Sequence, residues 1–111
     1  MKTSLKGFNE ACVTFIGTTE AGRAVKLTAN NEIAPCGNGD DFIGFCISSK
    51  DNISCVQLGG FIKVPYSGSA PKVGFNRLSA DANGGVKLSE NGREHLVTEV
   101  DTIGSVAGII L

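Results

Sequence analysis

The chain has 111 residues, with ten basic and eleven acidic side chains and a formal net charge of −1. Because the charge is balanced and no basic run occurs, the sequence lacks the signature of a protein that binds nucleic acid or an anionic membrane. Fifteen glycines and no tryptophan, with no segment rich in alanine, leucine, glutamate and lysine together, favour strands and turns over helices.

Residues 1–10 mix lysine, threonine, serine and glycine without clear periodicity. We expect them to form a flexible N-terminal arm, followed by a single β domain over residues 11–111. No apolar run in residues 1–17 has the length of a secretion signal, and no later segment approaches the roughly 18 apolar residues of a membrane span. The sequence therefore predicts a soluble protein without a secretion signal.

Short strands are predicted at 12–16, 23–28 and 33–35. In the second of these, alternation places Val25 and Leu27 on the inner side. A turn at Asn30 and Asn31, both of which tolerate positive φ, returns the chain with Leu27 opposite Ala34.

Residues 41–67 carry the clearest strand pattern in the chain. A turn at Lys50 and Asp51 predicts a hairpin in which Cys46 lies opposite Cys55. One face then carries Ile43, Phe45, Ile47, Val56, Leu58, Ile62, Val64 and Tyr66. The glycine pair at 59–60 predicts a bulge or corner at which the long strand bends from one sheet toward another.

The second face of this hairpin is neither polar nor fully apolar. Its large side chains and thiols are Phe42, Cys46, Ile53, Cys55 and Phe61. Together they would form an awkward exposed cluster in a monomer, so either a second sheet or a neighbouring subunit must cover them. We expect this face to pack against a partner, and Ile53→Asp or Phe61→Asp to weaken association more than folding.

After residue 67 the pattern predicts a strand at 73–78, in which Val73, Phe75 and Arg77 share a face. A hairpin of undetermined register follows at 86–89 and 94–100 around Asn91-Gly92, and the chain ends on a buried strand at 105–111. The expected fold is mainly β: a single small β-sandwich or partly open β-barrel of about eight or nine short strands, with little helix.

The four cysteines have no C-x-x-C spacing, and the single histidine, His95, is remote from them in sequence. No zinc site is signalled. We expect free thiols in a reducing compartment, with a disulfide between the facing Cys46 and Cys55 left open.

No arrangement of residues points to catalysis. His95, the only histidine, follows a hairpin turn and is expected to be solvated. The adjacent Asp40 and Asp41 would point to opposite faces of an extended chain, while Glu99 and Asp101 would share a face without a calcium-loop pattern around them. We therefore expect no enzyme and no catalytic, cofactor or metal residues.

Several segments together carry a family resemblance. GRAVKL from residue 22, FIGFC from 42, VQLGGFIKVPYSG from 56, GGVKL from 84 and the apolar terminal strand occur in this order. In order and spacing the chain from residue 22 onward resembles the small decoration, or cement, proteins of tailed-bacteriophage capsids.

The resemblance implies a β-rich structural protein of the virion, made in the host cytoplasm and bound to the capsid exterior. Its partners would be the major capsid protein and two further copies in a homotrimer, with no nucleic acid, membrane or cofactor. It would stabilise the assembled shell. The resemblance does not reach residues 1–10.

Two other functions stay open: a receptor- or carbohydrate-binding β-module of a phage tail or fibre, and an enzyme that pairs a cysteine with His95. The candidate interface residues for the decoration role are the apolar anchors of the arm and of the second hairpin face, namely Leu5, Phe8, Phe42, Ile53 and Phe61.

Overall fold

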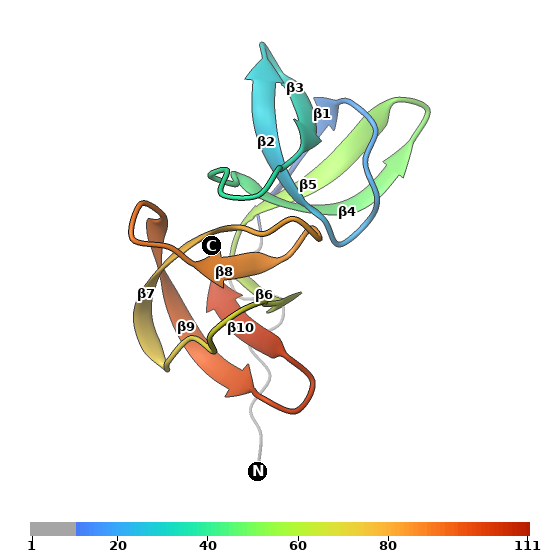
Figure 1. Cartoon of the computed structure of the whole chain (residues 1–111). Coiled ribbons are helices and arrows are strands. Elements are labelled where there is room, and N and C mark those ends of the chain that lie inside the picture. Colours follow the sequence, from blue (N-terminus) through green and yellow to red (C-terminus); the bar gives the residue numbers. More distant parts are fainter. Residues whose placement is uncertain (1–10) are drawn as a thin grey trace.

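The computed structural model describes residues 11–111, which form ten strands in two sheets and, within this range, no helix (Figure 1). The predicted fold class is confirmed. The first sheet contains β1 (Ala11–Ile16), β2 (Ala24–Ala29), β3 (Glu32–Pro35), β4 (Gly44–Lys50) and β5 (Ile53–Gly59). The second contains β6 (Phe61–Pro65), β7 (Gly74–Ala80), β8 (Val86–Leu88), β9 (Arg93–Asp101) and β10 (Val106–Ile110).

The first sheet closes into a barrel in the order β1-β3-β2-β4-β5 and occupies the upper part of Figure 1. β1 closes it by pairing antiparallel with β5 and parallel with β3, where Ile16 lies opposite Glu32. The second sheet has the order β6-β10-β9-β7-β8. An isolated β-bridge between Tyr66, which follows β6, and Val86 of β8 joins its two edges. The two sheets follow each other in sequence, strands one to five and six to ten.

The corner between the two sheets lies at Gly60, as the glycine pair predicted. β5 ends at Gly59, β6 begins at Phe61, and Gly60 adopts a φ of 83°. Residues with a side chain rarely adopt this conformation. One continuous stretch therefore contributes a strand to each sheet.

The β4–β5 hairpin turns one residue later than predicted. Asp51 and Asn52 have φ values of 54° and 64°, as a two-residue primed turn requires. This turn pairs Cys55 with Ser48, and a bulge at Ile47 then pairs Cys46 with Val56. The predicted pairing of Cys46 with Cys55 is wrong, because Asn52 accommodates positive φ and the bulge shifts the register again.

The β2–β3 register also differs from the prediction. Leu27 lies opposite Ile33, and a bulge separates Leu27 from Ala29. Val25 is fully buried as predicted, but Leu27 is 52% exposed. Leu27 lies near the tip of the β2–β3 hairpin, which projects at the top of Figure 1 away from the second sheet, so its predicted inward position is wrong.

Two apolar clusters fill the molecule. The smaller one lies in the barrel and consists of Val25, Ile33, Cys46 and Val56. The larger one combines barrel residues with the inner face of the second sheet: Ala24, Cys36, Phe42, Phe45, Val64, Leu78, Ala80, Val86, Val97, Ala107 and Ile109. Neighbours such as Phe45 and Cys46 point to opposite sides of β4, one into each cluster. This arrangement explains why both faces of the hairpin look apolar in the sequence.

Backbone hydrogen bonds reinforce the joint between barrel and second sheet. The loop after β3 exchanges two of them with Ala80, from Gly39 N–H to the Ala80 oxygen and from Ala80 N–H to the Asp40 oxygen, both at 2.8 Å. Ala24 N–H donates to the Gly84 oxygen at 2.9 Å. The two sheets therefore share both a core and a polar seam.

Candidate functional site

An apolar row crosses the outer face of the second sheet. Phe75 of β7 lies opposite Leu96 of β9, Leu96 opposite Ile110 of β10, and Ile110 opposite Phe61 of β6. Directly opposite residues share a face of the sheet. We call these four residues the apolar row.

The apolar row is open to solvent. Phe75 is 70% exposed and Leu96 37%, while Phe61 and Ile110 are half-buried. Val73, just before β7, is 72% exposed. Soluble monomers rarely expose a contiguous apolar patch without a function, and such patches mark contact surfaces. The apolar row is therefore the candidate functional site.

Charges and a glycine border the row at β10. A side chain at Gly108 would meet the Phe61 ring at 2.8 Å, so the missing Cβ lets that ring lie against the strand. Lys63 and Glu99, the neighbours of Gly108 on either side, form an ion pair at 3.5 Å. A cavity of about 310 Å³ lies beside this ion pair and is lined by Lys63, Glu99, Val100, Asp101, Val106 and Gly108.

The structure separates the interface residues that the sequence grouped. Leu5 and Phe8 lie outside the described residues. Phe42 is 3% exposed and belongs to the core, where an intramolecular layer covers it. Ile53 is half exposed, but it lies on the barrel opposite Ile16. Phe61 lies beyond the Gly60 corner in the apolar row.

The sequence did not predict that Phe75, Leu96 and Ile110 belong to a contact surface. The alternation at 73–78 predicted that Val73 and Phe75 share a face, and both are exposed, but no local feature indicated which face was buried. The register of the β9 hairpin was undetermined from sequence, so Leu96 could not be assigned to the same face.

His95 is buried, contrary to the expectation of a solvated strand end. It is 7% exposed and its ring stacks on Phe42, with centroids 5.0 Å apart. Nδ1 lies 3.4 Å from the Ile110 oxygen, which requires a proton on Nδ1, and the buried Nε2 has no partner within residues 11–111. Burial lowers the pKa of His95 below 6.5, outweighing the Ile110 carbonyl, which acts in the opposite direction. A neutral core histidine fits these contacts.

Acidification should therefore destabilise the domain through His95. Its folded-state pKa is lowered, so as pH falls below the ordinary value of 6.5 the unfolded chain takes up the proton first. The stabilising contribution is complete above that pH and is lost as the pH approaches the folded-state pKa. Urea unfolding at neutral and mildly acidic pH should show a smaller pH-dependent loss in His95→Gln than in the parent; equal losses would contradict this role.

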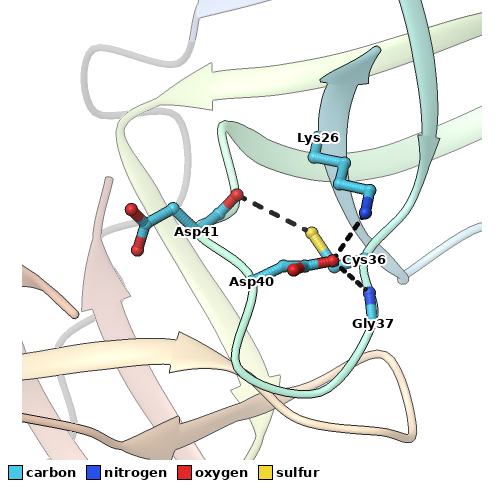
Figure 2. A network of polar contacts seen from close by, with 5 residues as sticks. All are labelled: Lys26, Cys36, Gly37, Asp40 and Asp41. Carbon is cyan, nitrogen blue, oxygen red and sulfur yellow. Dashed lines mark hydrogen bonds and ion pairs between the residues drawn. The ribbon is translucent and has the colours of Figure 1, made fainter. Parts of the chain in front are cut away.

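A network of polar contacts surrounds Asp40 in the loop after β3 (Figure 2). Its Oδ2 accepts hydrogen bonds from Lys26 Nζ and from Gly37 N–H, both at 2.7 Å. The hydrogen bond from Lys26 lowers the pKa of Asp40 below its ordinary value. The Asp41 carboxylate points away from Asp40 in Figure 2. The network therefore fixes the loop that binds Ala80.

Cys36 in this network is poorly suited to nucleophilic chemistry. Its Sγ lies 3.9 Å from the Asp41 oxygen, and burial, followed by the negative charge of Asp40, raises the pKa of the thiol to about 11. The thiolate is the reactive form of cysteine. Cys36 is consequently protonated at neutral pH.

The four cysteines should differ in their rates of alkylation. Cys12 is exposed and Cys55 half-buried, whereas Cys36 and Cys46 are buried. Because the pKa rises from 9.0 to about 11, the thiolate fraction of Cys36 at neutral pH is about a hundredfold lower than that of an ordinary thiol, and Cys36 should react more slowly. Peptide mapping after timed iodoacetamide treatment measures the order, and rapid labelling of Cys36 in folded protein would contradict it.

Metal-ligating side chains do not converge in the described part of the chain, where no group of three or more histidine, cysteine or acidic residues could hold an ion. The carboxylates of Glu99 and Asp101 have other contacts. Glu99 pairs with Lys63, and Asp101 accepts the Ile103 and Gly104 N–H groups at 3.0 and 3.1 Å. None of residues 11–111 lies in a helix, so this range includes no helical membrane span.

No protein-family model matches this sequence, and a search of curated proteins finds no significant similarity.

Proposed function

We propose that this protein is a capsid decoration protein that binds the outside of a phage head and stabilises the shell. The order and spacing of segments such as GRAVKL, FIGFC and VQLGGFIKVPYSG supports the proposal, as does the small all-β fold. The observation that carries it is the apolar row, a partly exposed apolar surface that crosses four neighbouring strands of the second sheet.

The row suits docking on an assembled surface. Its side chains project from neighbouring strands of one sheet, so little conformational entropy is lost when a partner covers them. Burial of apolar area stabilises a complex by roughly 25 cal/mol per Å² before the costs of association. A protein that binds the assembled shell but not free subunits stabilises the shell by mass action.

The homotrimer implied by the resemblance is part of the proposal. A second exposed apolar pair, Ile16 and Ile53 on the outside of the barrel, supplies a contact between neighbouring copies that is distinct from the apolar row. The proposed partner of the row is then the major capsid protein.

Co-sedimentation tests the proposal. The purified protein is mixed with undecorated heads and, separately, with unassembled capsid subunits of the same phage. We expect saturable binding to heads and weak binding to subunits. Equal binding to both, or binding to neither, would refute the proposed function.

A further inference from the structure

Three asparagine-glycine pairs occur in turns of the described chain, at 38–39, 83–84 and 91–92. In such a pair the glycine nitrogen can attack the asparagine side chain, because glycine has no Cβ to hinder the approach. The attack forms a bond between the glycine nitrogen and Cγ of the asparagine. The glycine nitrogen loses its proton to solvent, and the nitrogen of the asparagine side chain leaves as ammonia. Water then opens the five-membered succinimide to aspartate or isoaspartate.

The three glycine N–H groups differ in the hydrogen bonds that they donate. Gly39 N–H donates to the Ala80 oxygen at 2.8 Å, and Gly92 N–H donates to the Ser89 oxygen at 3.0 Å. Gly84 N–H has no hydrogen-bond acceptor anywhere in residues 11–111. Attack from Gly39 or Gly92 must first break a hydrogen bond, whereas attack from Gly84 need not.

The surroundings of Gly84 also favour the reaction. The Asn83 side chain is exposed, and Asn83 N–H donates to Asp81 Oδ1 at 2.8 Å, which holds the turn. Arg23 packs on Gly84, its Cγ only 2.8 Å from where a Cβ would stand. Arg23 Nε is buried without an acceptor among the described residues. The positively charged Arg23 side chain therefore lies beside the glycine whose nitrogen loses its proton.

We propose that Asn83 is a modification site at which the folded chain preferentially forms a succinimide and then aspartate or isoaspartate. The position matters for the fold. Gly84 oxygen accepts from Ala24 N–H, and Gly85 N–H donates to Asp81 Oδ1 at 2.9 Å. Isoaspartate adds one carbon to the backbone between 83 and 84, which displaces these groups and loosens the seam between barrel and second sheet.

The test follows all three sites in one molecule. The full chain is incubated in mildly alkaline buffer, folded or in urea, and peptide mapping by mass spectrometry measures conversion at 38, 83 and 91. A glycine hydrogen bond protects by about fivefold, which is about 1 kcal/mol at 1.4 kcal/mol per tenfold. We therefore expect conversion at Asn83 at least about fivefold faster than at Asn38 and Asn91 in folded protein only.

Matched variants complete the test. Asn83→Gln should remove most of the mass gain of the folded protein, whereas Asn91→Gln should remove little of it. The isoaspartate form, separated from the parent, should melt at a lower temperature. Conversion at Asn38 or Asn91 as fast as at Asn83, or the same ranking in urea as in the folded state, would overturn the proposal.

Discussion

Phe45→Ala should lower the free energy of unfolding by about 3–5 kcal/mol, the range for deleting a buried aromatic side chain. Phe45 belongs to a barrel strand, yet its fully buried ring lies in the core shared with the second sheet, 5.2 Å from the Phe42 ring. Its removal leaves a cavity at the place where the two sheets meet. Urea unfolding monitored by circular dichroism measures the loss.

The matched control is Phe75→Ala, the same change at an exposed ring. Phe75 is 70% exposed, so its replacement should change stability by no more than about 0.5 kcal/mol. Equal losses for the two variants would contradict the assignment of Phe45 to the shared core and of Phe75 to the surface.

Phe75→Ser combined with Leu96→Ser should weaken binding to phage heads by about 30-fold or more, which corresponds to a hot-spot loss of about 2 kcal/mol. The two residues face each other on adjacent strands and are the most exposed members of the apolar row. Their replacement removes apolar contact area from the proposed interface and leaves the inner face of the sheet intact. Titration of heads with labelled protein measures the dissociation constant.

A second double variant controls for a general loss of apolar surface. Ile16→Ser with Ile53→Ser removes the exposed pair on the barrel, at 48% and 51% exposure. It should weaken contacts between copies and leave the intrinsic affinity of each copy for the shell unchanged. If this variant loses shell affinity while the row variant keeps it, the docking surface is on the barrel.

Local sequence rules predicted the strands and corners well. The glycine pair at 59–60 predicted the corner, because glycine weakens the interior of a strand and readily adopts the positive φ that a sharp bend requires. The alternation around Val25 correctly predicted that it is buried. Both features depend on a few adjacent residues, so they can be predicted without knowledge of how distant strands pair.

Pairing over long distances could not be predicted. The apolar row exists only because four strands from three parts of the chain align Phe61, Phe75, Leu96 and Ile110. The predicted β4–β5 register was wrong because the turn lies one residue later than predicted and a bulge at Ile47 shifts the pairing again. A one-residue shift moves every later side chain to the other face. The predictions that Phe42 and His95 are exposed were wrong for a similar reason. Their rings stack on each other although the two residues are 53 positions apart in the sequence.

If the protein stabilises an assembled shell, as proposed, it should raise the temperature at which heads release their packaged DNA. Undecorated heads, heads saturated with the parent protein, and heads mixed with the Phe75→Ser, Leu96→Ser variant are heated while a dye reports escaping DNA. We predict a higher release temperature for the parent-saturated heads alone. Saturating binding of the parent with an unchanged release temperature would contradict the claim.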